Sequence, residues 1–151
     1  MTKLSPHSGI IEDKIHKLPL RVYYEDTDAG RIVYYANYLK YIERGRSDYL
    51  RMMNIDQIKL MDPTFTETPI QFVVKSCTLN YHRAAYLDDE IIVETKITKA
   101  GRASLIMQQN IIKDTKLLVD ATVKVGVIGI DHRPCPLAAP LYEILKQHCS
   151  S

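Results

Sequence analysis

Three carboxylates lie close together near the start of the chain, where a turn leads into a helix-like pattern. Glu25, Asp26 and Asp28 are followed by Gly30, and short polar residues with a glycine favour a turn. The N-terminus of the helix predicted to follow offers free backbone N–H groups and the positive end of the helix dipole. A carboxylate and a group that stabilises negative charge are therefore expected side by side.

This combination suits acyl transfer at a carbonyl such as that of a thioester. Backbone N–H groups polarise the carbonyl and hold the developing oxyanion while a carboxylate supplies the attack. Asp28 either attacks directly to form an anhydride or removes a proton from water, and both routes need the same residue. Spacing alone also fits a second interpretation, in which these acids only cap the helix or build the turn.

Composition and charge disfavour several other classes of site. No His or further carboxylate stands at ligand spacing from the three acids, so we expect no metal and no cofactor. The formal charge of +2 comes from 20 basic and 18 acidic residues spread along the chain, which argues against a nucleic-acid partner. Cys77, Cys135 and Cys149 are odd in number and lack CxxC spacing. The chain also contains no apolar run of signal-peptide or membrane-spanning length. Together these features indicate a soluble cytoplasmic protein with reduced thiols.

The elements that position the carboxylates follow from length and periodicity. A chain of 151 residues predicts one domain, with residues 1–17 as a flexible N-terminal arm and residues 18–151 as the folded unit. Between residues 34 and 53 apolar side chains return near the helical period, which predicts one long amphipathic helix. Gly45 lowers the helix propensity there and is typical of close packing against another element.

The rest of the chain predicts strands and a closing helix, after a first strand that begins near Leu18. Short connections predict antiparallel hairpins. The long helix can bury its apolar stripe only against the concave face of a curved antiparallel sheet, which is an α+β architecture. Apolar and polar residues alternate most clearly in the last predicted strand. The predicted strands are residues 69–81, 90–99, 102–112 and 117–130, and the closing helix is residues 137–148.

A long motif surrounds the turn and the helix start. It reads Arg21-Val-Tyr-Tyr-Glu-Asp-Thr-Asp-Ala-Gly, then Val33-Tyr34, Ala36-Asn37-Tyr38-Leu39 and Glu43-Arg44. The motif resembles the YbgC-like branch of the 4-hydroxybenzoyl-CoA thioesterase family. The similarity covers residues 20–130 and continues through Asn80-Tyr81, Leu87-Asp88-Asp89 and Arg102-Ala-Ser.

The resemblance implies a hotdog fold, in which the sheet wraps the long helix. It also implies hydrolysis of acyl-CoA thioesters at sites in the interface of a homodimer or homotetramer. By motif position Asp28 matches the family's catalytic aspartate, and Tyr35 stands where a backbone N–H points at the thioester carbonyl. Arg102 and Ser104 lie in the region that contacts the CoA phosphates, a role that suits arginine. A solvated hairpin arginine is the alternative.

Two positions depart from the YbgC-like pattern. Members of that branch usually carry His where this chain has Tyr35, and a second Gly where it has Arg31. Tyr35 removes an imidazole but keeps a backbone donor, and the 4-hydroxybenzoyl-CoA branch also has Tyr there. Arg31 restricts the dihedral freedom of the turn. We therefore expect substrate choice to be the property that differs.

Three other functions remain open. Thioesters of acyl carrier protein are a close variant of the CoA substrate. A hydratase acting on acyl thioesters would need an Asp and His pair, and no His follows Asp28 at close range. A non-catalytic partner in cell-envelope maintenance is the third, because YbgC-like proteins are associated by family with the Tol-Pal system.

Overall fold

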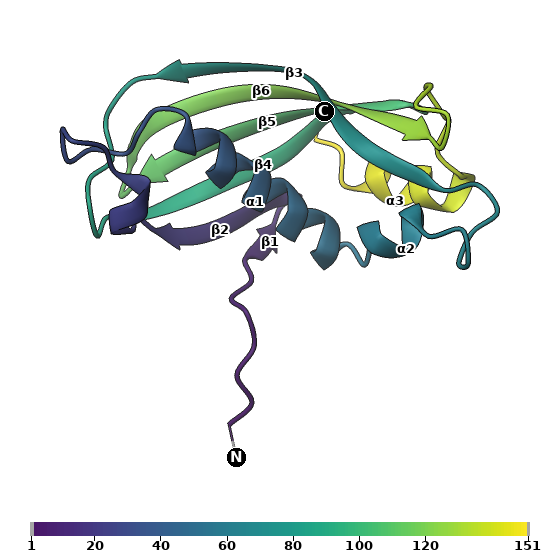
Figure 1. Ribbon diagram of the computed structural model, residues 1–151, viewed down its shortest axis with the longest axis horizontal. Helices are drawn as coiled ribbons and strands as arrows, with labels where there is room; N and C mark the ends of the chain where they lie inside the picture. Colours follow the sequence, from purple (N-terminus) through teal and green to yellow (C-terminus); the bar gives the residue numbers. More distant parts are fainter. Residues whose placement is uncertain (1, 151) are drawn as a thin grey trace.

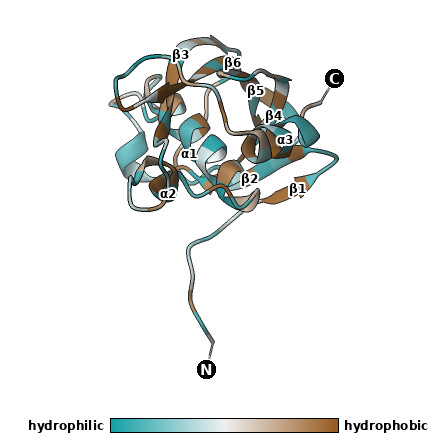
Figure 2. Cartoon of the chain, turned by 90° about the vertical axis from the view of Figure 1, so that its right-hand side faces the viewer, coloured by the Kyte–Doolittle hydropathy of each residue, from teal (hydrophilic) through white to brown (hydrophobic). Residues whose placement is uncertain are grey.

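The computed structural model describes residues 2–150, and an antiparallel sheet forms most of it. The six strands follow the order β1-β2-β4-β5-β6-β3, and the long helix α1 (Asn37–Met52) lies against the inner face of the sheet (Figure 1). Seen from the end, the strands curve around α1 (Figure 2). The strands are β1 (Ile10–Glu12), β2 (Ile15–Arg21), β3 (Ile70–Tyr81), β4 (Glu90–Ala100), β5 (Ser104–Lys113) and β6 (Lys116–Gly129).

The alternating pattern of the sequence explains which face of the sheet is buried. In β6, Val119, Ala121 and Val123 are fully buried, whereas Thr122 and Lys124 are exposed. Side chains of opposite parity point to opposite faces of a strand, so the apolar set faces α1 and the polar set faces outward. The β4–β5 and β5–β6 hairpins, the long helix and the α+β architecture are thereby confirmed. The hairpin expected between strands 69–81 and 90–99 is wrong, because β3 pairs with β6 while β4 lies between β2 and β5.

The structure differs from the sequence-based expectation at the N-terminus. Strand pairing begins at Ile10, inside residues 1–17, which were expected to form an arm. Asp13 and Lys14 connect β1 to β2 with φ of 50° and 68°, the left-handed geometry of a two-residue hairpin turn. Neither residue is a glycine, and for that reason the usual hairpin signal is missing from the sequence.

Three short helices complete the described part of the chain. The 3₁₀ helix η1 (Tyr24–Asp26) precedes the carboxylate turn, and α3 (Ala139–Gln147) is the predicted closing helix. The helix α2 (Gln57–Met61) was not predicted; its N-cap is Asp56, whose side chain accepts two backbone N–H groups. None of the helices in residues 2–150 is long and apolar enough to cross a membrane.

Asp48 on α1 binds the segment that leads into β1. Its carboxylate accepts hydrogen bonds from the Ser8 hydroxyl at 2.8 Å, the Gly9 N–H at 2.8 Å and His16 Nε2 at 2.6 Å. Burial lowers the pKa of His16, so the imidazole is neutral and donates through Nε2–H. These bonds connect the start of the sheet to α1 even though residues near the N-terminus contribute little apolar surface.

α1 approaches the sheet most closely at Gly45. A Cβ atom at this position would lie 2.8 Å from Val93 Cγ1 and 3.0 Å from Thr95 Oγ1. Gln109 on β5 is fully buried, and its Nε2 donates to the Ile42 carbonyl and to Thr95 Oγ1, both at 2.8 Å. The absent side chain of Gly45 therefore lets a polar group of the sheet reach the backbone of the helix.

We predict that Gly45→Ala lowers the free energy of unfolding by about 1–2 kcal/mol, because overpacking of the tight contact outweighs the better helix propensity of alanine. Urea denaturation measures the difference. Lys40→Ala, an exposed change on the same helix, should stay within about 0.5 kcal/mol of the wild type. A more stable Gly45→Ala variant would contradict the close-packing account.

Candidate active site

The carboxylate turn is a small hairpin that returns the chain to the start of α1. Thr27 and Val33 form a β-bridge, and the Asp28 N–H donates to the Ile32 carbonyl at 2.9 Å. The Tyr34 N–H donates to the Asp26 carbonyl at 2.9 Å. These bonds hold the turn and the residues that enter α1 in one unit at one end of the molecule.

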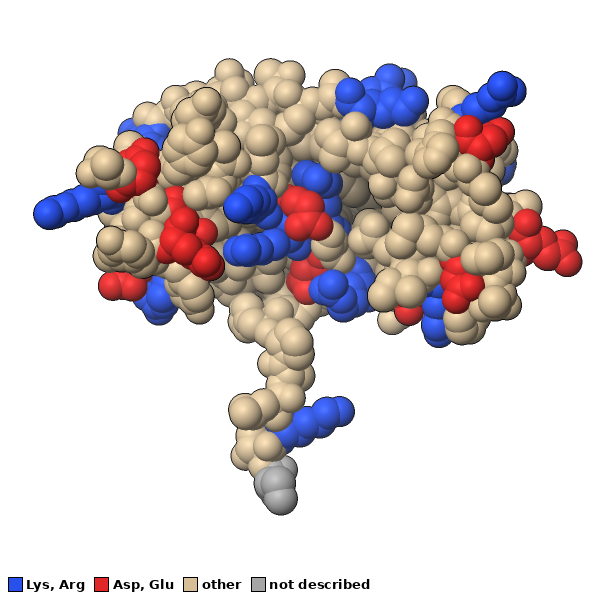
Figure 3. Space-filling model, in the orientation of Figure 1, with Lys and Arg blue, Asp and Glu red and all other residues tan. Residues whose placement is uncertain are grey.

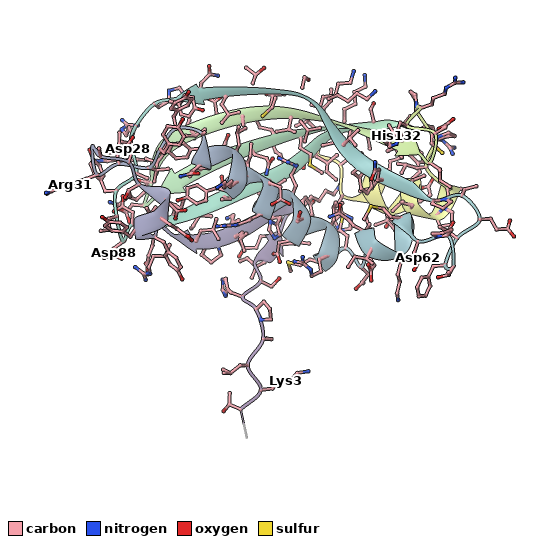
Figure 4. The ribbon with its side chains drawn as sticks, viewed as in Figure 1. Lys3, Asp28, Arg31, Asp62, Asp88 and His132 are labelled. Carbon is pink, nitrogen blue, oxygen red and sulfur yellow. The ribbon has the colours of Figure 1, made fainter. Side chains whose placement is uncertain are left out.

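Asp28 lies at the exposed tip of this hairpin, next to Arg31 (Figure 4). Its Oδ1 accepts the Gly30 N–H at 2.8 Å, and its carbonyl accepts the Arg31 N–H at 2.9 Å. Within residues 2–150 the second carboxylate oxygen, Oδ2, has no hydrogen-bond partner. Asp28 thus shapes its own turn with one oxygen and presents the other to solvent.

The neighbouring acid Asp26 has a different role. It is buried, its Oδ2 accepts the Tyr23 N–H at 2.8 Å, and its carbonyl accepts Asn37 Nδ2 at 2.8 Å. Asp26 therefore joins η1 to the first residue of α1. Glu25 is exposed, and no hydrogen bond of its side chain is found within residues 2–150. The interpretation in which acids build the turn holds for the buried Asp26, whereas Asp28 combines turn building with a carboxylate oxygen that is exposed to solvent.

The N-terminus of α1 is not capped by a side chain. Its N-cap residue is Ala36, and the first turn contains no acidic residue. The Tyr35 N–H, which directly precedes this cap, has no acceptor within residues 2–150. The positive end of the helix dipole and at least one free donor are therefore available at the end of the molecule where Asp28 lies.

The side chain of Tyr35 points outward and is 63% exposed. Its ring meets Tyr81 edge-on with centroids 6.3 Å apart, and the Tyr81 hydroxyl donates to the Tyr35 carbonyl at 3.2 Å. The next ring inward, Tyr38, lies 5.7 Å from Tyr81 and accepts the Ala85 N–H through its hydroxyl. The contacts among these three tyrosine rings hold the first residues of α1 in place.

Arg102 and Ser104 lie at the opposite end of the sheet. Arg102 belongs to the turn between β4 and β5, Ser104 is the first residue of β5, and β5 runs from there back toward the Asp28 end (Figure 1). Ten strand residues span about 33 Å. The Arg102 guanidinium stacks on the ring of Tyr142 in α3, 4.4 Å from its centroid. One copy of the chain therefore does not bring Arg102 or Ser104 to Asp28.

A groove between α1 and β3 was not apparent from the sequence. It has a volume of about 590 Å³ near the start of the helix and continues into a second hollow of about 220 Å³ farther along. Glu43, Arg46 and Val74 line both parts. Helix periodicity predicts only that polar residues such as Glu43 and Arg46 lie outside the core. It does not show whether their side chains line a groove or face open solvent.

Two other polar residues, Glu43 and His82, make only local contacts. Glu43 is exposed and accepts the Ser47 hydroxyl at 2.6 Å. His82 pairs with Asp120 at 2.5 Å and is also exposed. Within the described residues no group of three His, Cys, Asp or Glu side chains is placed to hold a metal ion.

Comparison with known proteins shows extensive similarity. The sequence profile of the thioesterase superfamily matches residues 30–119, a range that begins just after Asp28. The chain is 41% identical to the acyl-CoA thioesterase YbgC of Haemophilus influenzae over 128 residues, 85% of this chain and 90% of that protein. It is 39% identical to the acyl-CoA thioester hydrolase YbgC of Escherichia coli O157:H7 over 135 residues, 88% of this chain and 97% of that protein. A probable thioesterase from Bartonella henselae has a similar crystal structure, with a TM-score of 0.76, 33% identity and coverage of 82% and 99% of the two chains.

Arg31 adopts φ of 64°, the left-handed region that glycine occupies without penalty. We predict that Arg31→Gly raises the free energy of unfolding by about 1 kcal/mol, because the clash of Cβ with the backbone is removed. Arg31→Ala retains the Cβ atom and should show no such gain. Thermal or urea unfolding of the three proteins compares them, and an equal effect of both substitutions would contradict the strain argument.

Proposed function

The chain belongs to the thioesterase superfamily and is an acyl-CoA thioester hydrolase, and we propose that Asp28 is its catalytic carboxylate. One observation carries this assignment. Asp28 keeps a carboxylate oxygen free at the end of the molecule where the uncapped N-terminus of α1 offers the Tyr35 N–H. A carboxylate and an electrostatic site for an oxyanion are the two parts that thioester hydrolysis needs.

Two routes use these parts. In the first, Asp28 Oδ2 attacks the thioester carbon, the carbonyl oxygen becomes an oxyanion held by the Tyr35 N–H, and the C–S bond breaks to release CoA thiolate. Water then hydrolyses the mixed anhydride and restores Asp28. In the second, Asp28 removes a proton from a water molecule, and that water attacks the same carbon. Both routes give the free acid and CoA.

The absence of an imidazole at Tyr35 fits either route. The role proposed for this residue belongs to its backbone, and its exposed ring packs against Tyr81. Any residue other than proline supplies a backbone N–H. The ring and the neighbouring Tyr34, whose centroid is 4.9 Å away, then shape the entrance for the acyl group.

We further propose that the working enzyme contains at least two copies of the chain. β3 is a strand of 12 residues at the edge of the sheet, and a long unpaired edge favours pairing with another strand. Two-fold pairing of β3 edges is antiparallel, so each copy would place its β4–β5 turn beside the Asp28 end of the other. A homodimer would thus bring Arg102 and Ser104 of one copy to the Asp28 site of its partner, and a homotetramer would join two such pairs.

Arg102 and Ser104 are proposed to bind the phosphates of CoA in that dimer. A guanidinium recognises phosphate through paired N–H donors. The stacking on Tyr142 holds the Arg102 side chain but leaves it exposed. Phosphopantetheine of acyl carrier protein carries fewer phosphates than CoA, so this contact favours CoA thioesters. The three free thiols support a reducing, cytoplasmic location.

We predict that Asp28→Asn lowers kcat/KM for acyl-CoA by about 100- to 10,000-fold, the range for loss of a positioned carboxylate. Asparagine keeps an oxygen that can accept the Gly30 N–H, so the turn should persist. Release of CoA, measured with a thiol reagent, reports the rate, and circular dichroism checks the fold.

Glu25→Gln provides the matched control, because Glu25 is exposed and belongs to the same cluster of acids. It should retain nearly full activity. Turnover of a panel of acyl-CoAs by Asp28→Asn at the wild-type rate would remove Asp28 from the mechanism.

Mixing two variants of low activity, Arg102→Ala and Asp28→Asn, tests whether each active site is shared between two copies of the chain. Arg102→Ala should raise KM for acyl-CoA, and its activity at low substrate should be small. After subunit exchange with Asp28→Asn, half of the dimers are mixed and each contains one intact site, so about a quarter of the wild-type activity should return. If both residues acted within one chain, no activity would return.

A further inference from the structure

A guanidinium lies inside the groove between α1 and β3. Arg46 lines both the wider part of the groove near the start of α1 and the narrower part beyond it. The narrower part is otherwise mostly apolar, with walls from Phe72, Leu105, Met107 and Val125. A charged group among such side chains needs a polar partner to offset its loss of hydration.

Gln109 holds Arg46 in this position. The Gln109 side chain is fully buried, and its Oε1 accepts a hydrogen bond from Arg46 Nη1 at 3.1 Å. Its Nε2 is fixed by the Ile42 carbonyl and Thr95 Oγ1, so the orientation of the amide is determined by the helix and the sheet together. The guanidinium is therefore supported from the core side by a rigid group.

Among residues 2–150, the other N–H donors of Arg46 have no hydrogen-bond acceptor, and no carboxylate lies within salt-bridge distance of it. Glu43, which lines the same groove, accepts the Ser47 hydroxyl and acts on Arg46 only through longer-range attraction. Burial lowers the pKa of Arg46, although a guanidinium remains charged at neutral pH. Most of its donors thus face the groove without a hydrogen-bond partner among the described residues.

The groove leads from the proposed reaction centre to this charge. Its wider part begins at Leu39, one turn beyond the N-terminus of α1, and also contains Lys40 and Arg44. On the face of the molecule shown in Figure 3, Lys and Arg side chains gather beside a hollow next to α1, with acidic side chains among them. Arg46 lies nine residues beyond Asn37, the first residue of α1, and nine helical rises correspond to about 14 Å. An acyl chain whose carbonyl is held at Tyr35 can therefore extend along apolar walls to Arg46.

We propose that Arg46 is a specificity-determining residue that binds a carboxylate at the far end of the acyl chain. This inference rests on the proposed function, because it takes the N-terminus of α1 as the place of the thioester carbonyl. The preferred substrates would be CoA thioesters of dicarboxylic acids of medium length. Arg46 and the terminal carboxylate form a charge-assisted hydrogen-bonded pair, and the apolar walls bind the methylene groups between the two ends.

The experiment compares pairs of acyl-CoAs that differ only at the end of the chain. Octanedioyl-CoA carries a carboxylate where octanoyl-CoA carries a methyl group. The wild type should prefer octanedioyl-CoA in kcat/KM, and Arg46→Met should lower the value for this substrate by about 10- to 100-fold while changing octanoyl-CoA little. Arg46→Lys, which keeps the charge, should recover part of the preference.

Arg51→Met is the matched control, since it removes an exposed positive charge from the same helix and Arg51 lines neither part of the groove. It should leave the ratio of the two substrates within about 3-fold of the wild type, as expected for a solvent-exposed charge. An equal loss for both substrates in Arg46→Met would indicate binding of CoA phosphates or a contact between copies, and would overturn the proposal. An unchanged ratio would overturn it as well.

Binding of thioether analogues separates this inference from the proposed function. S-octyl-CoA and its carboxyl-terminated counterpart cannot be hydrolysed, so calorimetry measures affinity without turnover. The carboxyl-terminated analogue should bind the wild type about 10- to 100-fold more tightly than S-octyl-CoA, and Arg46→Met should abolish the difference. This result would stand even if Asp28→Asn retained activity. Equal affinities in the wild type would exclude the carboxylate site.

Discussion

The close contact between α1 and the sheet at Gly45 is the constraint on which the other features depend. A side chain there would collide with Val93 and Thr95, and its absence brings the helix within reach of Gln109. Gln109 then binds both the Ile42 carbonyl and Arg46. The same contact fixes the direction of α1, and thereby the place of its N-terminus and the width of the groove beside it.

In the turn that precedes this helix, two neighbouring carboxylates have different roles. Asp26 is buried and accepts the backbone N–H groups of Tyr23 and Tyr34, before and after the hairpin, together with the side-chain amide of Asn37, the first residue of α1. Asp28 stands at the exposed tip with one oxygen free. Because α1 has no acidic residue in its first turn, no side chain neutralises the positive end of its dipole. A substrate carbonyl at this end of α1 would therefore experience the full positive end of the helix dipole.

The periodicity of the sequence predicted the long helix and the main strands, and the motif around the carboxylate turn predicted the candidate catalytic residue. Alternation in β6 and periodicity in α1 gave the α+β architecture, and the carboxylate turn gave Asp28 as the candidate catalytic residue. The β1–β2 hairpin was missed because Asp13 and Lys14 adopt left-handed angles without glycine. The position of Arg46 in a groove was missed because it depends on Gln109, 63 residues away, and on a groove wall supplied by β3. Contacts of that kind have no signature in one segment of sequence.

The central claim is that α1 organises the chemistry, with the thioester carbonyl at its N-terminus and the acyl chain along its side. The crystal structure of the Asp28→Asn variant with intact octanoyl-CoA tests this claim most directly. The account predicts a carbonyl oxygen about 3 Å from the Tyr35 backbone nitrogen, the side chain of residue 28 beside the thioester carbon, and the acyl chain in the groove toward Arg46. An ordered ligand whose carbonyl lies away from the N-terminus of α1 would contradict it.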